Sequence, residues 1–354
     1  MEKFSRVVRC IDLKKDLAAF LEKTSYDRLF VLTDTNTLEH CFPLIKEVSQ
    51  IKDATVITVK AGDLNKNINQ LSEIWELLSN GGASRGSLMI NLGGGMITDM
   101  GGFAAATFKR GMKSVNIPTT LMAAVDAAVG GKTGINFNGL KNEVGSFYPP
   151  MCVFIETEFF KTIDHQNLLS GYSEMIKHAL LSDQQTLALT LSFDLNTPDL
   201  ALLKELVVTS VEVKERIVEE DPFEKGIRKA LNLGHTIGHA FESLSFKKNK
   251  PLLHGHAVAA GLICELYLSY KLCGFPGDVL SKVVSFVKEF YSPFVFDCTD
   301  FDALYAYMLH DKKNEGGVIN FTLLKDVGEV MIDQNVDRKL IDESLDFYRD
   351  SFGF

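Results

Sequence analysis

The sequence has no excess of positive charge, no closely spaced cysteine pairs and no long apolar run. Its 46 Asp and Glu outnumber its 37 Lys and Arg, giving a formal net charge of −9. This balance argues against a general nucleic-acid binder or a basic membrane-surface protein. The six cysteines lie far apart without a CxxC motif, which is typical of reduced thiols rather than of a disulfide framework. Any anionic ligand must therefore meet a local cluster of cations.

Targeting and membrane segments are also missing from the sequence. The first twelve residues carry charges and no apolar h-region of a secretory signal. The longest apolar candidate, residues 257–264, stops at Glu265, far short of the roughly 20 residues that a bilayer requires. We therefore predict a cytoplasmic protein that binds neither membranes nor nucleic acids.

The hydrophobic pattern changes character at about residue 160. The chain has 354 residues, of which 46% are hydrophobic, enough for two domains with sizeable cores. Before this point, short apolar runs typical of buried parallel strands alternate with helical patterns; they cover residues 28–34, 54–59, 87–92, 113–118 and 152–156. Beyond it come long amphipathic segments and one expected hairpin, over 318–332. We predict a Rossmann-like α/β domain with a parallel sheet over residues 1–160 and a mainly α-helical domain over 161–354.

A glycine-rich turn follows the third expected strand. Gly93, Gly94 and Gly95 come directly before a helical pattern, so backbone amides and a helix N-terminus could meet a pyrophosphate. The motif departs from GxGxxG, and a tight turn that binds nothing is the alternative. Asp34 ends an earlier strand and could accept a ribose hydroxyl, although such residues commonly serve as turn or cap residues.

Histidines and a glutamate form a second group of candidates. His235 and His239 are spaced i, i+4 and share one face of a helix. His254 and His256 precede a very apolar helical run, and Glu174 lies in a third segment. Two imidazoles and a carboxylate with an open position are what catalytic Zn²⁺ uses, although histidines at helical spacing are often incidental.

Cations in apolar or glycine-rich surroundings form a third group. Lys214 and Arg228 could equally be ordinary surface charges. Together the group indicates a substrate with more than one negative charge; its members are Arg110, Lys132, Lys141, Lys177, Lys214, Arg228, Lys312 and Lys313.

These pieces resemble the 3-dehydroquinate synthase family, over about residues 30–315. The resemblance is carried by GGGMITDMGGFAAATFKRG, VDAAVGGKTGIN, LKN, SGYSEMIKH, NLGHTIGHA, HGHAVAAG and DKKN. It implies NAD in the N-terminal domain, a divalent metal in the C-terminal domain (Zn²⁺, with Co²⁺ as an option), and a homodimer. It also implies a carbon–oxygen lyase that converts 3-deoxy-D-arabino-heptulosonate 7-phosphate to 3-dehydroquinate and phosphate. The implied steps are transient oxidation by NAD, β-elimination, re-reduction and intramolecular aldol closure.

The resemblance also implies a role for each matching residue. The metal ligands would be Glu174, His235 and His254. Cofactor contacts would be Asp34, Asn36, Gly62, Asp63, Lys66, Gly94, Gly95, Met96, Ile97, Thr98, Asp99, Thr119, Thr120, Phe159 and Thr162. The catalytic residues would be His239, Lys132, Asp126, Lys177 and Asn232, with His239 the best candidate for proton transfer. Substrate would meet Lys141, Asn142, Lys214, Arg228, one or both of Lys312 and Lys313, and Arg110 from the other subunit.

Two departures from the family pattern and three alternatives stay open. His256 and Asp63 stand where the family commonly has Glu, so His256 could compete for metal and Asp63 could shift a cofactor contact. Other sugar-phosphate cyclases run the same chemistry, but they depart from GGKTGIN. A metal-dependent polyol or alcohol dehydrogenase would have little need for the cations. A binding protein that has lost catalysis is the third alternative.

Overall fold

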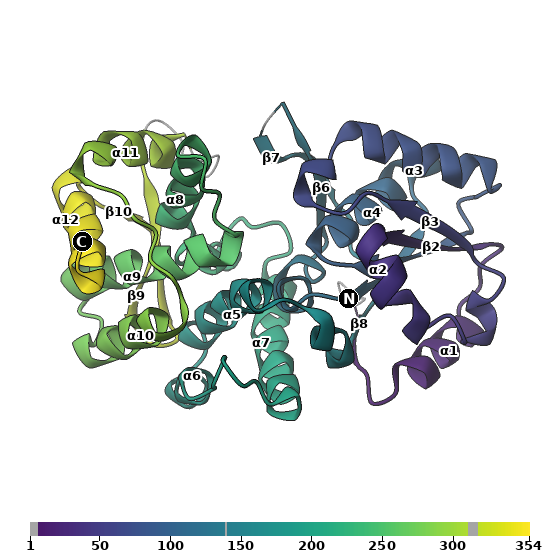
Figure 1. Cartoon of the computed structure of the whole chain (residues 1–354), viewed down its shortest axis with the longest axis horizontal. Coiled ribbons are helices and arrows are strands. Elements are labelled where there is room, and N and C mark those ends of the chain that lie inside the picture. Colours follow the sequence, from purple (N-terminus) through teal and green to yellow (C-terminus); the bar gives the residue numbers. More distant parts are fainter. Residues whose placement is uncertain (1–5, 139, 311–317) are drawn as a thin grey trace. The chain divides into compact units, whose positions relative to one another are not determined.

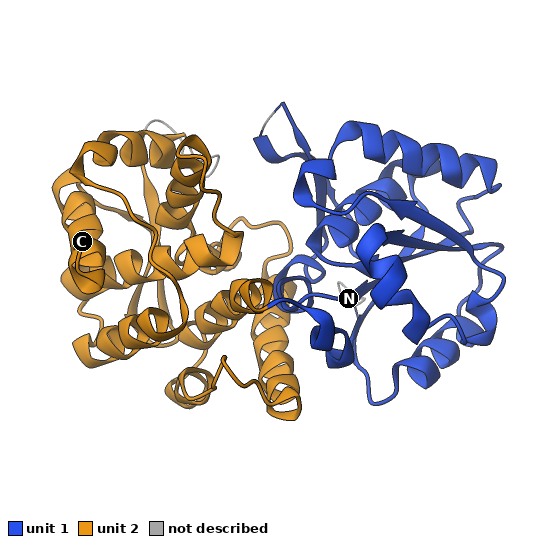
Figure 2. Cartoon of the chain, in the orientation of Figure 1, with its two compact units in different colours: residues 1–164 blue, residues 165–354 orange. Residues whose placement is uncertain are grey.

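The computed structural model describes residues 6–138, 140–310 and 318–354. These residues form two compact units that meet in sequence at Asp164 and His165, coloured separately in Figure 2. Lys312 and Lys313 lie outside the described residues, and all the other predicted site residues lie within them. We describe each unit by itself.

The first unit is built on a six-stranded sheet in the order β1-β8-β5-β4-β2-β3, with every pairing parallel (Figure 1). The five expected strands are confirmed, and the structure adds β1 at the edge. From β2 the chain passes outward to β3 and then returns to β4 on the other side of β2, so the strand order reverses between β2 and β4. The strands are β1 Arg6–Arg9, β2 Leu29–Asp34, β3 Thr55–Val59, β4 Leu88–Gly93, β5 Lys113–Pro118 and β8 Cys152–Ile155.

Helices α3 and α4 pack against this sheet. Leu71, Ile74 and Leu78 recur at helical spacing on α3 and are fully buried, in one core with Phe30 and Ile57 of the strands. This apolar stripe is what fixes α3 on the sheet. The helices of the unit are α1 Leu13–Lys23, α2 Thr35–His40, α3 Ile68–Asn80 and α4 Gly95–Thr107, with short helical turns η1 Phe42–Leu44, η2 Ser49–Ile51, η3 Asp63–Asn65, η4 Phe108–Arg110, η5 Ala123–Ala127 and η6 Thr157–Thr162.

A hairpin that we did not predict carries several predicted site residues. It consists of β6 (Lys132–Phe137) and β7 (Leu140–Phe147), paired antiparallel. Glycines and polar residues interrupt its alternation, and most of β7 is exposed, so the apolar periodicity that reveals a strand is weak here. Lys132, Lys141 and Asn142 all lie on this hairpin.

The second unit is mainly helical, as expected, and its one hairpin, between β9 and β10, is also confirmed. No helix in the described part of the chain is both long and apolar enough to cross a bilayer. The elements are α5 His165–Leu180, α6 Gln184–Leu191, α7 Leu200–Glu220, η7 Ile227–Asn232, α8 His235–Lys247, α9 His254–Cys273, α10 Gly277–Phe290, η8 Cys298–Asp300, α11 Phe301–Leu309, β9 Asn320–Asp326, β10 Glu329–Asn335 and α12 Arg338–Phe352.

Glycines let three helices of the second unit approach closely. A Cβ atom on Gly255 of α9 would lie 1.8 Å from the Ser170 carbonyl oxygen of α5. A Cβ atom on Gly261 would lie 2.1 Å from the Gly234 carbonyl oxygen at the start of α8. Both distances are far below van der Waals contact, so a larger residue would force the helices apart. The glycines therefore bring the N-terminal end of α9 next to α5 and the N-terminal end of α8 next to α9.

Candidate active site

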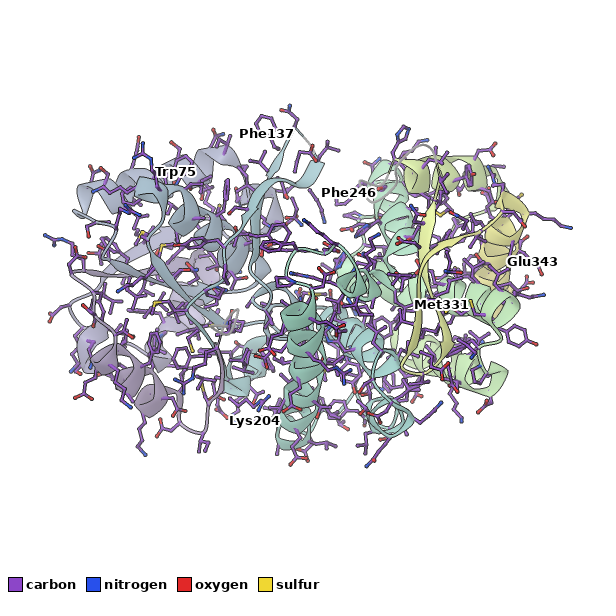
Figure 3. The ribbon with its side chains drawn as sticks, turned by 180° about the vertical axis from the view of Figure 1, so that it is seen from behind. Trp75, Phe137, Lys204, Phe246, Met331 and Glu343 are labelled. Atoms are coloured by element: carbon purple, nitrogen blue, oxygen red, sulfur yellow. The ribbon has the colours of Figure 1, made fainter. Side chains whose placement is uncertain are left out.

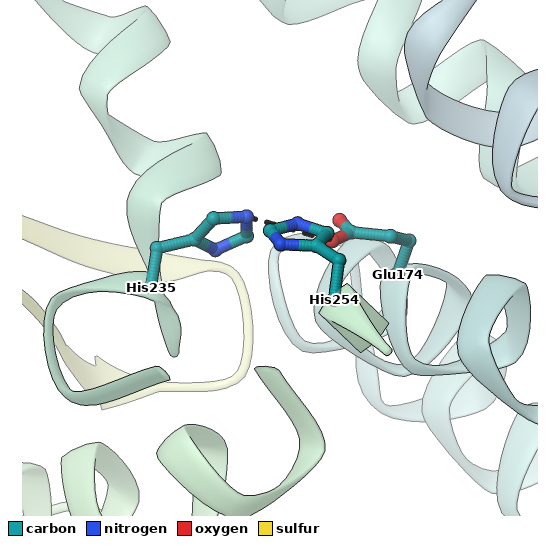
Figure 4. Close-up of side chains that lie close together, drawn as sticks. All are labelled: Glu174, His235 and His254. Carbon is teal, nitrogen blue, oxygen red and sulfur yellow. Dashed lines mark ion pairs between the residues drawn. The ribbon is translucent and has the colours of Figure 1, made fainter. Parts of the chain in front are cut away.

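Three predicted metal ligands from separate helices converge in the second unit. Glu174 lies within α5, while His235 and His254 are the first residues of α8 and α9. The Glu174 Oε1 atom lies 3.5 Å from the Nε2 atom of His235 and 3.6 Å from that of His254. Figure 4 shows both rings turned toward the carboxylate. One ligand atom from each residue fits within a span of 4.8 Å, so the cluster can hold a single ion.

The donor set suits a divalent metal such as zinc. Zinc binds imidazole nitrogen and carboxylate oxygen at about 2.0–2.2 Å, so two ligands of a tetrahedral ion lie roughly 3.3–3.5 Å apart. The observed separations of 3.5 and 3.6 Å are close to this spacing. Glu174 is completely buried, and a buried carboxylate near two imidazoles favours a cation there. Three protein ligands also leave a position open for substrate.

His254 lies between two carboxylates. Its Nε2 atom faces Glu174, and its Nδ1 atom lies 3.5 Å from the Glu242 Oε2 atom. Burial lowers the pKa of His254, but the contacts with Glu174 and Glu242 outweigh it and raise the pKa to about 9. The surroundings of this ring therefore stabilise positive charge, as expected of a cation-binding site.

Other residues border the cluster. Lys177, which is almost fully buried, forms an ion pair with the Glu174 Oε2 atom. The His239 ring centroid lies 5.4 Å from that of His235 and 5.8 Å from that of His254. His239, Glu242 and His254 form a second group of close donor atoms. Glu242 was not among the predicted residues, although its i, i+3 spacing from His239 places it on the same face of the helix.

His256, the departure from the family pattern, points elsewhere. Its Nε2 atom lies 3.1 Å from the Gln166 carbonyl oxygen, and its ring packs edge-on against Tyr291 at 5.3 Å. Burial lowers the pKa of His256. It belongs to none of the donor groups found among the described residues. The neutral ring is therefore a packing and hydrogen-bonding residue next to the cluster.

Two cations that the sequence left ambiguous are buried. Lys214 on α7 is 5% exposed and Arg228 in η7 is 2% exposed, so the surface-charge alternative is wrong for both. The Arg228 Nη1 atom donates to the Pro222 carbonyl oxygen at 2.5 Å, and Asn232 donates to Glu224 at 3.3 Å. Buried cations are costly unless counter-charges or ligands compensate them, and Asp221 lies close enough to Arg228 for the guanidinium charge to lower the pKa of Asp221.

Two features predicted to bind a cofactor lie at neighbouring strand ends in the first unit. Asp34 ends β2, and Gly94 and Gly95 follow β4, the strand next to β2. The strand order reverses between these two strands, which is where dinucleotides bind in open parallel sheets. Asp34 is also a helix cap, because its Oδ1 atom accepts the N–H groups of Asn36 and Thr37 at 2.8 and 2.9 Å. Both N–H groups bind the Oδ1 atom, so capping does not use the Oδ2 atom in these contacts. The contact of Asp34 with a ribose hydroxyl therefore stays a prediction.

A buried lysine connects predicted cofactor and substrate residues within the first unit. The Nζ atom of Lys66 donates to Asp99 and to Asn142, at 2.5 Å each. The Lys66 carbonyl oxygen accepts the N–H of Asn136, whose side chain accepts the N–H of Asn142 at 3.0 Å. This network holds the β6–β7 hairpin to helix α4.

The remaining predicted residues of this unit are distributed around the sheet and the hairpin. The N–H of Thr119 donates to the Gly93 carbonyl oxygen at 3.0 Å, next to the glycine turn. Asp63 lies 3.7 Å from Lys141 in an exposed ion pair. The others lie as follows: Gly62 before η3, Met96, Ile97 and Thr98 in the first turn of α4, Arg110 in η4, Thr120 just before η5, Asp126 in η5, Lys132 at the start of β6, and Phe159 and Thr162 in η6.

Comparisons with known proteins agree over most of the chain. Family models described as the N-terminal and C-terminal parts of 3-dehydroquinate synthase match residues 56–170 and 171–314. A 3-dehydroquinate synthase of Parabacteroides distasonis is 64% identical over 98% of this chain and 99% of its own. One from Campylobacter jejuni is 36% identical over 92% of this chain and 94% of its own.

Solved structures share the fold at lower identity. The 2-epi-5-epi-valiolone synthase ValA of Streptomyces hygroscopicus, with NAD⁺ and Zn²⁺ bound, has a TM-score of 0.86 and 23% identity, covering 98% of this chain and 97% of its own. A 2-deoxy-scyllo-inosose synthase complex with carbaglucose-6-phosphate, NAD⁺ and Co²⁺ has a TM-score of 0.82 and 23% identity, covering 94% and 93%. With the matches to both family models and the 64% identical relative, these similarities lead to one conclusion: the chain belongs to the 3-dehydroquinate synthase family.

Proposed function

We propose that this protein converts 3-deoxy-D-arabino-heptulosonate 7-phosphate to 3-dehydroquinate and inorganic phosphate. The observation that carries the proposal is the 64% identity to a curated 3-dehydroquinate synthase over nearly the whole length of both chains. The convergence of Glu174, His235 and His254 supports it, because this chemistry acts on substrate hydroxyl groups that a metal can bind.

NAD and a divalent metal, Zn²⁺ or Co²⁺, are the cofactors that we propose. Glu174, His235 and His254 would hold the metal, and the ends of β2 and β4 would hold NAD. When bound, the metal would lower the cost of forming an alkoxide, and NAD would take up a hydride and return it. Two solved structures of the same fold contain NAD⁺ with Zn²⁺ or Co²⁺, which supports this pair.

The buried cations would bind the two anionic groups of the substrate. Lys214 and Arg228 are held in place before any substrate arrives, since both are already buried. In such a site charge stabilisation costs little reorganisation, and the phosphate can be aligned for departure. Lys132, Lys141 and Asn142 would contribute from the hairpin, and Lys312 and Lys313, outside the described residues, from their own segment.

Proton transfers would fall to His239 and to the substrate's own phosphate. A ketone at C5 makes the C6 hydrogen acidic, so phosphate can leave C7 with its own oxygen accepting that proton. His239 lies beside both metal-binding histidines, within reach of groups bound there. Lys177 and Asn232 would orient substrate hydroxyl groups, as would Asp126. After the ketone is reduced, ring opening would release an enolate that attacks the carbonyl carbon. Because the hydride taken from the substrate is returned to it, the net redox change is zero.

A homodimer with Arg110 serving the partner's site is part of the proposal. The β6–β7 hairpin exposes apolar side chains: Phe137, labelled in Figure 3, is 42% exposed, Val144 39% and Phe147 44%. Exposed apolar side chains on a two-stranded hairpin favour burial against another surface. Light scattering should give twice the monomer mass, and Arg110→Ala should lower activity without changing that mass.

The decisive experiment supplies the heptulosonate phosphate, catalytic NAD and Zn²⁺. We expect equal amounts of phosphate and 3-dehydroquinate to form with no accumulation of NADH. Lasting NADH formation from an uncharged alcohol would instead indicate a dehydrogenase. A cyclitol product from another sugar phosphate would indicate a related cyclase, and binding of NAD without phosphate release would indicate a protein that has lost catalysis.

A further inference from the structure

We propose that helices α8 and α9 position each other's metal-binding histidine through two buried glutamates. Glu265 of α9 would fix the backbone that carries His235 of α8. Glu242 of α8 would orient the ring of His254 of α9. Both would be positioning residues, and the inference rests on the proposed metal site.

Glu265 holds the first turn of α8. Its side chain is completely buried. The Oε2 atom accepts the N–H of Gly234 at 2.6 Å, and the Oε1 atom accepts the N–H of Ile237 at 3.0 Å. These two N–H groups flank His235 in sequence and belong to the unsatisfied donors of a helix N-terminus. A buried carboxylate that binds both fixes the position of the His235 Cα atom, and its charge suits the helix dipole.

The backbone at Gly234 leaves little freedom for the first turn of α8 to move. Gly234 has a φ of +79°, in the left-handed region, and its carbonyl oxygen lies against Gly261 of α9. The Nδ1 atom of His235 lies 3.1 Å from the Leu233 carbonyl oxygen, so the ring turns its Nε2 atom toward Glu174. A shift of this turn would therefore move the ligand atom itself.

Glu242 acts on the side chain rather than on the backbone. Its Oε2 atom lies 3.5 Å from the Nδ1 atom of His254, on the opposite edge of the ring from Glu174. Metal-binding histidines usually donate their second N–H to a carboxylate or carbonyl, which fixes the tautomer and raises ligand basicity. In the tautomer in which Nδ1–H donates to Glu242, the Nε2 lone pair would be left for the metal.

The two glutamates thus make the helix pair reciprocal. Each helix begins with one histidine and carries, further along, the glutamate that serves the other helix. The close crossing at Gly234, Gly238 and Gly261 keeps both contacts in register. Loss of either glutamate alone should therefore weaken metal binding, and loss of both should weaken it further.

The test measures metal affinity directly, without turnover. Glu265→Gln and Glu242→Gln keep the side-chain volume, and Glu289→Gln, an exposed change on α10, is the control for charge. Zinc dissociation constants would be measured by competition with a chromophoric chelator, and the Co²⁺ absorption spectrum would report ligand geometry. We expect each buried variant to bind zinc about 10- to 100-fold more weakly, the double variant to bind it more weakly than either single variant, and the control to match wild type.

Three outcomes separate the possibilities. Unchanged zinc affinity and Co²⁺ spectrum in both buried variants would overturn the inference, even if their melting temperatures fall. Weaker binding in Glu242→Ala than in Glu242→Gln, whose amide oxygen still accepts from Nδ1, would support it. If His235→Ala leaves zinc affinity intact, the proposed metal site itself is wrong. Should Glu265→Gln not fold, Glu265→Asp, which withdraws the carboxylate by one methylene, takes its place with the same expectations.

Discussion

The two candidate sites are built in opposite ways. In the first unit, predicted cofactor residues lie at the ends of adjacent strands, where Gly94 is the N-cap residue of α4 and Asp34 caps α2. Backbone N–H groups would make many of the contacts with the cofactor there. In the second unit, the site consists of side chains from α5, α8 and α9, which are distant in sequence.

This difference decides what each site is sensitive to. A strand followed by a tight turn and a helix is a local structure, so a change there acts on the backbone of that turn. A cluster of side chains from three helices depends on how those helices pack. We therefore expect substitutions in the two units to affect NAD and metal binding separately.

The largest expected effect comes from removing a proposed metal ligand. His254→Ala should lower kcat/KM at least about 1000-fold, because a metal's stabilisation of developing charge is worth several kcal/mol. The NAD dissociation constant, measured by fluorescence, should change by no more than about threefold, which corresponds to less than 1 kcal/mol. His256→Ala, two residues away, is the matched control and should keep its zinc. Equal losses in both variants would contradict the assignment of the ligands.

Gly94→Val tests the proposed NAD site in the first unit. A side chain on Gly94 would begin 3.1 Å from the Thr120 methyl group, and the branches of Gly94→Val would cover the N-terminus of α4. NAD affinity should fall about 10- to 100-fold through lost hydrogen bonds, while zinc affinity should not change. Titration calorimetry with NAD and with Zn²⁺ measures the two affinities. A Gly94→Val protein that binds NAD normally would place the cofactor elsewhere.

Packing between the helices is tested at Gly255. Gly255→Ala places a methyl group where the Ser170 carbonyl oxygen already lies, and the overpacking should cost about 1–3 kcal/mol of folding free energy. Urea unfolding measures this free-energy loss. Zinc binding should also weaken, because α5 and α9 would move apart. Gly277→Ala, with its nearest neighbour at 3.3 Å on the flexible edge of Tyr270, should be nearly neutral.

The smallest effect concerns acid stability at the turn before Arg228. Burial raises the pKa of Asp221, but the N–H groups of Lys225, Gly226 and Arg228 outweigh it, so the pKa lies below its ordinary value of 3.8. A carboxylate with a lowered folded pKa stabilises the protein above the unfolded pKa, and this stability disappears as the pH falls through the folded value. Wild type should therefore lose more stability than Asp221→Asn between about pH 5 and pH 2. Parallel pH profiles in chemical unfolding would contradict this.

Much of the fold followed from local patterns. Continuous apolar runs predicted β2, β3, β4, β5 and β8 correctly, because most of these strands are buried on both faces and leave a strong signal. The β6–β7 hairpin was missed because glycines and polar residues interrupt its apolar pattern and most of β7 is exposed. The edge strand β1 is only four residues long, too short for periodicity to show.

The amino-acid sequence by itself determined the family, the α/β and helical halves, and the candidate histidines. The tertiary structure alone decided that His254 faces Glu174 while His256 turns to Gln166. It also decided that Lys214 and Arg228 are buried, that Glu242 of α8 lies next to His254, and that Glu265 of α9 binds the first turn of α8. The physical reason is that periodicity records which face of a segment is apolar, whereas contact between side chains is set by how separate segments pack.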